Sequence, residues 1–295
     1  MKPGNIVAYL FLAVAWGFSF LLILKVVQAF GWVGAVSFRA LVAGTTLLLT
    51  AAVTRRSLDF SVGWWRFAVV GATTVAVQLL GLSLATPRIG TAMAAILVAT
   101  IPLFSMVIAQ LWGIERLTPR TLAGLLLGFA GVVLLVGFPA VAITPSFLFG
   151  CASSIASSIG AAYGSNYANR HLRSTGSWEI TTGSFLAGGL LTLPLLLVAP
   201  VPAPPEPMDY FYLIVLGCVM SALTYVTYFR LVATIGATKA ISVEFAVTLV
   251  AVIVGATFLG ERLSALQMLG GAIVVGGCLL VLGLVPGRRR QPLPV

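Results

Sequence analysis

The chain is organised as long apolar runs separated by short polar or glycine- and proline-containing segments. A helix that crosses the ~30 Å hydrocarbon layer of a membrane needs about 20 mainly apolar residues, and each run approaches or exceeds that length. The runs cover residues 5–27, 31–53, 64–86, 90–112, 119–138, 146–169, 178–199, 209–230, 238–259 and 264–284. We therefore predict an all-α membrane protein with ten transmembrane helices.

Local signals mark some helix ends and bends. Thr118 followed by Pro119 is typical of an N-cap with proline at the first helical position, and Ser264 occupies the equivalent place before the tenth run. Residues 199–207 contain five prolines and predict a loop. Pro102 and Pro194 fall inside runs, where proline frees backbone groups, so both are candidate hinges, with static bends as the alternative.

Composition excludes a water-soluble protein. Apolar residues make up 60% of the chain and charged residues only 8%, against about 45–50% and about 25% in soluble domains. The net charge of +10 does not form a patch suited to nucleic acid, because the basic residues are spread between the runs. With a cytoplasmic N-terminus, 13 of the 17 basic residues lie on the cytoplasmic side. The four left in the outer half are Lys25, Arg39, Arg88 and Arg262. We therefore predict that both termini are cytoplasmic.

Motifs for catalysis or ATP hydrolysis are missing from the sequence. None of the three lysines follows a glycine, which excludes a G-x-x-x-x-G-K-[ST] phosphate loop. The one histidine, His171, cannot build a zinc-protease motif, and Cys151, Cys218 and Cys278 lie in apolar runs at no metal-ligand spacing. We therefore predict no enzymatic activity, no cofactor and no metal site.

The second half of the chain repeats the first at an offset of 146 residues. The block Glu115-Arg116-Leu117-Thr118 matches Glu261-Arg262-Leu263-Ser264. Further matches are Trp32 with Trp178, Ile89-Gly90 with Ile235-Gly236, and Gly71, Gly124, Gly131 and Gly137 with Gly217, Gly270, Gly277 and Gly283. Each half holds five runs, an odd number, so the second half should insert upside down, as in many secondary transporters. We predict a first repeat over 1–138, an external linker over 139–145, an inverted second repeat over 146–285 and a basic cytoplasmic tail over 286–295.

Charged side chains inside apolar runs need an explanation, because each costs about 2.5–3.5 kcal/mol at a helix centre on insertion scales. Glu244 lies roughly 9 Å inside the ninth run, and Lys239 five positions earlier is not at the i,i+4 spacing of a helical ion pair. Glu244 is therefore a candidate for binding a substrate ammonium group or a proton, with an interhelical hydrogen bond as the alternative. Arg39 and Lys239 are candidate gating or structural charges.

Polar and aromatic side chains at matched depths suggest a binding site near the bilayer midplane. Gln78 and Thr224 are repeat mates, and Trp16 and Tyr163 are matched at an offset of 147 in the middle of their runs. Ser19 lies on the same helix face as Trp16, and Asn166 lies on the same face as Tyr163, because residues three positions apart are neighbours on a helix. The candidate substrate-binding residues are Trp16, Ser19, Gln78, Tyr163, Asn166, Thr224, Tyr225, Tyr228 and Glu244. Plain interhelical packing and hydrogen bonding is the alternative.

The sequence resembles the drug/metabolite transporter superfamily, in its ten-helix branch of EamA-type exporters. The resemblance covers about residues 5–285 and is carried by Trp16-Gly17, Phe38-Arg39 and the two Glu-Arg-Leu blocks. Within that branch the chain is most similar to bacterial exporters of amino acids, including aromatic ones. The resemblance implies a ten-helix basket with a central cavity, located in the bacterial inner (plasma) membrane.

These observations predict a secondary transporter that exports small zwitterionic metabolites by alternating access of two inverted repeats. Amino acids with apolar or aromatic side chains are the favoured substrates. The expected partners are this small-molecule substrate and membrane lipids. Gly124-x-x-x-Gly128 and Gly160-x-x-x-Gly164 allow close helix approach and are compatible with a monomer or a weak homodimer. The alternative is a membrane receptor or scaffold that binds a metabolite without moving it.

Overall fold

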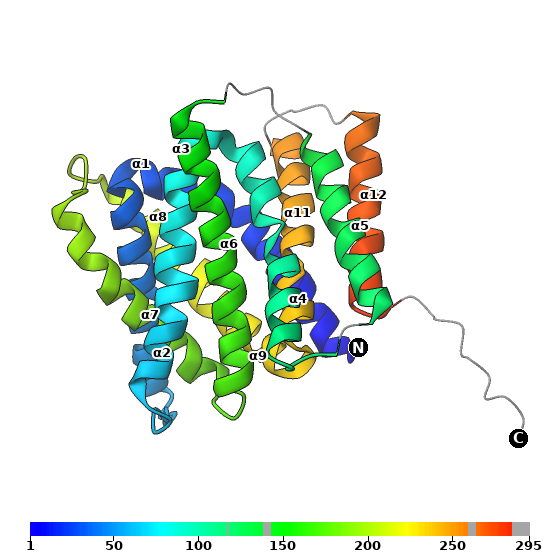
Figure 1. Ribbon diagram of the computed structural model, residues 1–295. Helices are drawn as coiled ribbons and strands as arrows, with labels where there is room; N and C mark the ends of the chain where they lie inside the picture. The colour runs from blue at the N-terminus through cyan, green and yellow to red at the C-terminus, as the bar shows by residue number, and fades with distance from the viewer. Residues whose placement is uncertain (117, 138–142, 259–263, 285–295) are drawn as a thin grey trace, which may run out of the picture.

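The protein is a bundle of helices packed side by side (Figure 1). The computed structural model describes residues 1–116, 118–137, 143–258 and 264–284, and these ranges contain helices and connecting segments but no β-strand. The N-terminus and the end of the last helix lie at the same end of the bundle (Figure 1). Residues 139–142 of the predicted linker, the tail 286–295 and the predicted repeat block Glu261-Arg262-Leu263 fall outside the described residues.

The first helix, α1, runs over Pro3–Val53 and covers the first two predicted runs without a loop between them. Gly31 divides it into two arms, because its φ of 71° and ψ of 169° interrupt the helical backbone. Glycine adopts a positive φ without the steric cost that other residues pay. A single residue therefore makes the turn that we expected from a short connection.

The rest of the first half contains several irregular helices. Helix α2 (Trp64–Val70), the π-helix η1 (Gly71–Val77) and α3 (Gln78–Val98) follow one another directly. After a break at residues 99–100 come α4 (Ile101–Leu111) and then α5 (Pro119–Val136).

The second half has a similar series of helices. It begins with α6 (Pro145–His171) and α7 (Ser177–Thr192), which the 3-10 helix η2 (Leu193–Leu197) extends. Then come α8 (Pro207–Gly217), the π-helix η3 (Cys218–Leu223), α9 (Thr224–Ile235) and the short α10 (Ala237–Ile241). The last two helices are α11 (Val243–Phe258) and α12 (Ala265–Val281).

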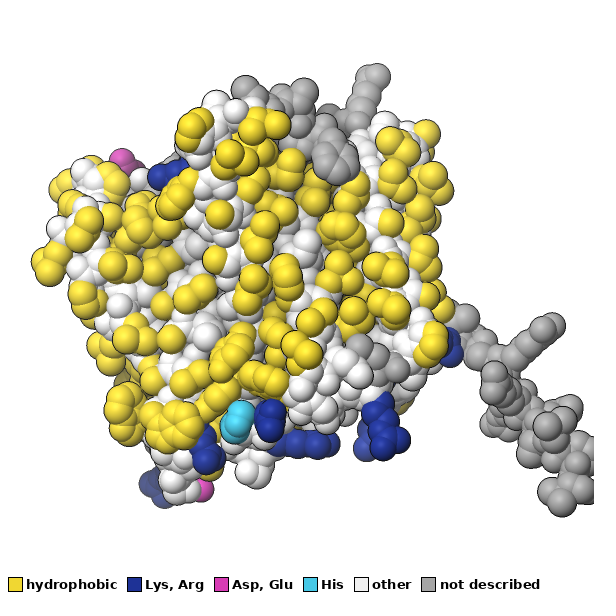
Figure 2. All heavy atoms as spheres, in the orientation of Figure 1, with side chains coloured by type: hydrophobic (Ala, Val, Ile, Leu, Met, Phe, Trp, Pro, Cys, Tyr) yellow, Lys and Arg dark blue, Asp and Glu magenta, His cyan; other side chains and the backbone are white. Residues whose placement is uncertain are grey.

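The surface of the bundle is suited to lipid. Seven helical segments are long and apolar enough to cross a membrane, and three shorter apolar helices cover Pro3–Ser19, Ile96–Leu111 and Ala265–Val281. Figure 2 shows hydrophobic side chains over the middle of one face and most of its Lys and Arg side chains at the end where the N-terminus lies. The protein is therefore an integral membrane protein.

Helices α5 and α12 pack more extensively than any other pair of described elements. Glycines make this possible: a Cβ atom added at Gly124 would lie 2.8 Å from the backbone nitrogen of Val281, and one at Gly131 would lie 2.7 Å from that of Val274. The glycine face of α5, which in the sequence is compatible with a monomer or a weak homodimer, is thus covered by α12 of the same chain.

The predicted helix starts are confirmed. The side-chain oxygen of Thr118 accepts a hydrogen bond from the Thr121 backbone nitrogen at 3.1 Å, and Ser264 forms the same type of cap with Gln267 at 3.2 Å. Residues 198–206 contain no helix or strand, as their prolines predicted.

The candidate hinges Pro102 and Pro194 lie where one helical segment gives way to the next, and their role as hinges stays a prediction. Pro102 lies in the first turn of α4, and Pro194 lies in the first turn of η2. Proline fits such positions because the backbone N–H that it lacks has no partner within the helix there. The proline inside a described helix is instead Pro87, in α3.

Candidate functional site

A cluster of aromatic side chains lies where α1 and α9 meet. The Trp16 ring centroid is 5.3 Å from that of Tyr225 and 5.6 Å from that of Tyr228. All three residues are buried, with exposed fractions of 9%, 6% and 3%. The indole nitrogen of Trp16 donates a hydrogen bond of 3.0 Å to the hydroxyl of Thr224. The structure therefore brings together four of the predicted binding residues, from two helices about 200 positions apart.

Further hydroxyl groups, from α1, α6 and the turn between α10 and α11, form hydrogen bonds around the buried centre. The Tyr228 hydroxyl shares a 2.7 Å hydrogen bond with Ser165 of α6. The Tyr9 hydroxyl shares one of 3.2 Å with Ser242, between α10 and α11, and donates to the sulfur of Cys278 at 3.5 Å. The sequence analysis did not single out Tyr9, Ser165 or Ser242. Tyr9 and Ser242 are 233 positions apart, and no repeat links them, so only the folded chain shows that they meet.

Glu244 adds a carboxyl group beside the cluster. The predicted ninth helix is broken at Ser242, which places Glu244 in the first turn of α11 rather than deep within one straight helix. Its charge lies within electrostatic range of the hydroxyls of Tyr9, Tyr225 and Tyr228. Glu244 is half-buried, and within the part of the chain that the structure describes its carboxyl group has no hydrogen-bond or ion-pair partner. The carboxyl group is thus able to accept hydrogen bonds from a ligand.

Arg39 is the second charged residue near the centre. Its side chain is 7% exposed, and its Nε donates a 2.5 Å hydrogen bond to the hydroxyl of Ser221 in η3. The guanidinium group also lies within electrostatic range of Tyr225. Arg39 therefore connects the second arm of α1 to a π-helix at the edge of the aromatic cluster.

The structure also shows the hydrogen bonds of three other predicted binding residues, Ser19, Asn166 and Gln78. Ser19 donates to the carbonyl of Trp16 at 2.7 Å. The Asn166 amide donates to Ser105, both to its carbonyl at 3.2 Å and to its hydroxyl at 2.9 Å, and so joins α6 to α4. Gln78 accepts a 2.7 Å bond from Ser157 through its backbone carbonyl, and its side-chain amide has no hydrogen-bond partner among the described residues.

Tyr163 lies apart from the residue with which the repeat matched it. Its ring packs edge-on against Trp112 at 5.1 Å and stacks on Tyr167 at 6.1 Å, and the residue is 36% exposed. None of these contacts involves Trp16. The structure therefore does not place Tyr163 against Trp16, because an offset along the chain does not fix which side of α6 faces the centre, and a role of Tyr163 in binding stays a prediction.

A polar hollow of about 390 Å³ opens at the end where the N-terminus lies. Its lining includes Glu115 from the segment before α5, Asn169 and Arg173 from α6 and the turn after it, and Lys239 from α10. Glu115 is bound to its surroundings, because its Oε1 accepts from the Asn169 amide at 3.4 Å and from the Thr238 backbone nitrogen at 3.3 Å.

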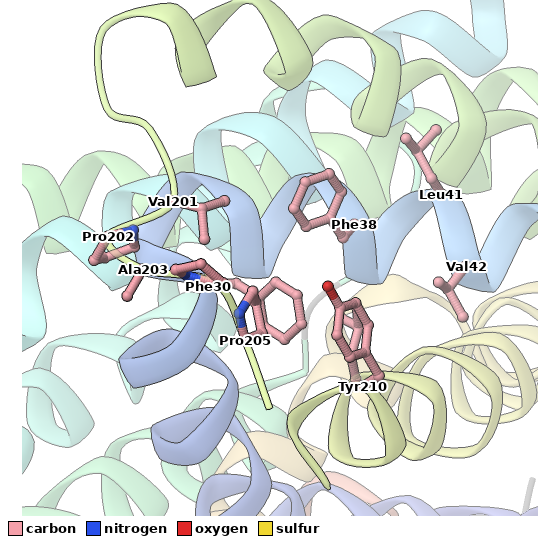
Figure 3. Close-up of a pocket in the computed structure, with 11 residues that line it drawn as sticks. Phe30, Phe38, Leu41, Val42, Val201, Pro202, Ala203, Pro205 and Tyr210 are labelled. Atoms are coloured by element: carbon pink, nitrogen blue, oxygen red, sulfur yellow. The ribbon is translucent and has the colours of Figure 1, made fainter. Parts of the chain in front are cut away.

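An apolar hollow of about 660 Å³ lies between the two arms of α1, the proline-rich segment and α8. Figure 3 shows Phe30, Phe38 and Tyr210 around it. The ring of Phe30 packs edge-on against Phe38 at 5.9 Å and against Tyr210 at 5.4 Å. The residues that line this hollow are mainly apolar, so it offers few groups for a charged solute.

The lipid-compatible exterior and the buried polar and aromatic centre define a multi-helix membrane protein. The profile of the EamA-like transporter family matches the chain twice, over residues 3–137 and 148–283. The chain therefore belongs to the EamA-like transporter family. Members of this family are transporters and not enzymes, so the protein is a transporter that acts on a small molecule in a lipid environment.

Two curated relatives are similar over most of their length. Protein PecM of Dickeya dadantii (strain 3937) is 26% identical over 283 residues, which cover 94% of this chain and 91% of PecM. A protein of Streptantibioticus cattleyicolor named "Probable terminal-alkyne amino-acid exporter" is 27% identical over 235 residues, which cover 76% of this chain and 75% of that protein. A protein crystal structure with 18% identity superposes with a TM-score of 0.80 over 96% of this chain and 99% of the other, which shows a shared fold.

Proposed function

We propose that this protein is a secondary transporter that exports small zwitterionic metabolites, with amino acids that carry apolar or aromatic side chains as its main substrates. The observation that carries the proposal is the carboxyl group of Glu244, which has no hydrogen-bond or ion-pair partner among the described residues and lies beside the cluster of Trp16, Tyr225 and Tyr228. The relative from Streptantibioticus cattleyicolor is named as an amino-acid exporter, which supports the same class of substrate.

The chemistry of the centre suits such a solute. The Glu244 carboxylate would accept hydrogen bonds from the substrate ammonium group, and a hydrogen bond to a charged group contributes about 1.5–3 kcal/mol. The indole ring of Trp16 and the phenol rings of Tyr225 and Tyr228 would pack against an apolar or aromatic side chain. The buried guanidinium group of Arg39, near Tyr225, supplies positive charge for the substrate carboxylate. The two ends and the side chain of an amino acid thus each find a suitable group.

The transport mechanism in this proposal is alternating access of two inverted five-helix repeats. In this proposal the seven long and three shorter apolar segments would make ten crossings of the membrane. Several structural features recur at the repeat offset: the N-caps Thr118 and Ser264, the positive φ of Gly137 and Gly283, and the π-helices η1 and η3. Rocking of such halves about a site near the midplane is the usual mechanism of transporters with inverted repeats.

The proposal also fixes an orientation. Most Lys and Arg side chains of the face in Figure 2 lie at the end that carries the N-terminus. Basic residues are retained on the cytoplasmic side of membranes, so both termini would be cytoplasmic in a bacterial inner membrane. Substrate would then enter from the end that holds the polar hollow.

Export by reconstituted protein tests this function. The purified protein is reconstituted in liposomes, and the liposomes are loaded with labelled phenylalanine or with another amino acid from a panel. Efflux is then measured with and without a pH gradient. Glu244→Gln should lower kcat/KM by about 10- to 100-fold, because it replaces a charged acceptor worth about 1.5–3 kcal/mol. The matched control is Glu206→Gln, an exposed acid at the start of α8, which should transport like the wild type.

Each result has a defined meaning. No efflux of any amino acid from wild-type vesicles overturns the export function. Unchanged transport by Glu244→Gln, at equal protein in the vesicles, removes Glu244 from the site. An efflux rate that is the same with and without the pH gradient is consistent with the export function but excludes obligatory proton coupling through Glu244.

A further inference from the structure

The polar hollow at the N-terminal end contains an unusual set of charges. Its lining includes two cations, Arg173 and Lys239, and one acid, Glu115. The acid already accepts hydrogen bonds from the Asn169 amide and from the Thr238 backbone nitrogen, both uncharged donors. Among the residues that the structure describes, neither cation forms an ion pair. The hollow therefore has positive charge available for a ligand.

Lys239 is the more informative of the two cations because it is half-buried, whereas Arg173 is exposed. Removing a charged group from water is unfavourable unless a counter-charge or hydrogen bonds replace the lost hydration. A half-buried ammonium group beside an exposed guanidinium group therefore favours an anion small enough to enter the hollow. The volume of about 390 Å³ lies in the range of about 300–1,000 Å³ typical of small-molecule sites.

The hollow adjoins the central cluster through the broken ninth segment. Lys239 lies in α10, Ser242 follows it and bonds to Tyr9, and Glu244 comes next in the first turn of α11. The Tyr228 hydroxyl lies within electrostatic range of both Glu115 and Glu244, the acid of the hollow and the acid of the centre.

We propose that this hollow is a binding site of its own, in which Lys239 and Arg173 take the carboxylate of the solute before the solute reaches the aromatic cluster. Glu115 faces the same space and would exchange its neutral donors for the substrate ammonium group. The inference rests on the proposed export of zwitterionic metabolites and adds a first selection step, for solutes that carry a carboxylate. An amine without a carboxylate lacks the group that the two cations recognise.

The test measures recognition of the carboxylate in the full-length protein. Efflux of labelled phenylalanine is measured in vesicles of neutral phosphatidylcholine, together with inhibition by phenethylamine, the same molecule without its carboxylate. The double variant Lys239→Gln/Arg173→Gln should raise the KM for phenylalanine about tenfold or more and leave inhibition by phenethylamine within about twofold of wild type, since tenfold corresponds to about 1.4 kcal/mol. The matched control is Arg230→Gln, an exposed cation on α9 that does not line the hollow, and it should change neither value.

The failure of this inference is distinct from failure of the export function. If wild-type protein moves no amino acid, the export function itself is wrong. If wild-type protein exports phenylalanine and the double variant has the same KM, the carboxylate site is wrong while export stands. If the double variant accumulates poorly, Arg173→Gln alone is measured, because its side chain is exposed and its loss should leave folding intact; an unchanged KM there also overturns the site.

A second set of vesicles tests whether the hollow binds the solute carboxylate or a lipid headgroup, whose phosphate carries a similar charge. Wild-type efflux is compared in phosphatidylcholine vesicles with and without anionic phosphatidylglycerol. A KM for phenylalanine that is equal in both supports a site for the solute. A KM that rises with phosphatidylglycerol, and does so only when both cations are present, assigns the hollow to lipid phosphate and overturns the proposal.

Discussion

The packing of α5 against α12 gives a sharp prediction, because two adjacent glycines of α12 have opposite surroundings. A Cβ atom added at Gly277 would lie 2.5 Å from the backbone nitrogen of Gly128 and 2.8 Å from the carbonyl oxygen of Gly124. A Cβ atom added at Gly276 would meet no atom within 4 Å. Gly277→Ala should therefore destabilise the protein, whereas Gly276→Ala should not.

The expected size follows from the geometry. At 2.5 Å, the new methyl group falls about 0.9 Å short of the 3.4 Å at which ordinary contact begins, and the atom that it meets is backbone, which cannot rotate away. Overpacking of a tight interface costs about 1–3 kcal/mol. Both variants gain the same helix propensity, up to about 1 kcal/mol for Gly to Ala, so this gain cancels when they are compared with each other.

Unfolding of the purified protein measures this difference. Tryptophan fluorescence is followed during titration of mixed micelles with sodium dodecyl sulfate, and the free energy of unfolding is compared between the two variants. We expect Gly277→Ala to be less stable than Gly276→Ala by about 1–3 kcal/mol. Equal stability of the two variants would refute the close approach of α5 and α12, since the argument depends on nothing else.

Two further substitutions test the centre and its support. Trp16→Phe removes the 3.0 Å hydrogen bond to Thr224 while keeping an aromatic ring, so we expect a loss of about 0.5–1.5 kcal/mol in unfolding free energy and a higher KM for phenylalanine. The control is Trp64→Phe, at an exposed tryptophan. Equal KM values for the two variants would contradict a role of Trp16 in binding. Asn166→Ala removes the hydrogen bonds to Ser105 that join α6 to α4, so we expect the free energy of unfolding to fall by about 1–3 kcal/mol while the KM for phenylalanine stays close to wild type. A raised KM at unchanged stability would show that Asn166 binds substrate instead.

The sequence predicted features that depend on neighbouring residues. The caps at Thr118 and Ser264 follow from one hydroxyl placed three residues before an N–H, and the structure has both. The proline-rich loop was predicted for a similar reason. The two π-helices were not predicted, because their hydrophobic pattern is that of an ordinary helix and the extra residue in each turn is fixed by packing.

Prediction of the site depended on which residues share a helix. Thr224, Tyr225 and Tyr228 lie together on α9; the spacing predicted the shared face of Tyr225 and Tyr228, and the repeat with Gln78 pointed to Thr224. Tyr9 and Ser165 come from other helices, and the sequence carries no signal that they approach this face. Tyr163 shows the same limitation in reverse, because its position along α6 was reasonable but its direction depends on how α6 is rotated against its neighbours.

The break at Ser242 links the shape of the backbone to the charge at the centre. A continuous ninth helix would place Glu244 in a helix interior, where its charge would have no compensating dipole. In the structure, Glu244 lies in the first turn of α11, and the positive end of a helix dipole stabilises a carboxylate there. Discontinuous helices with their ends at the binding site are a recurrent feature of secondary transporters. The broken helix therefore gives a physical reason why a carboxyl group without an ion-pair partner among the described residues is tolerated there, and the proposed contact with a cationic group of the solute would use that carboxyl group.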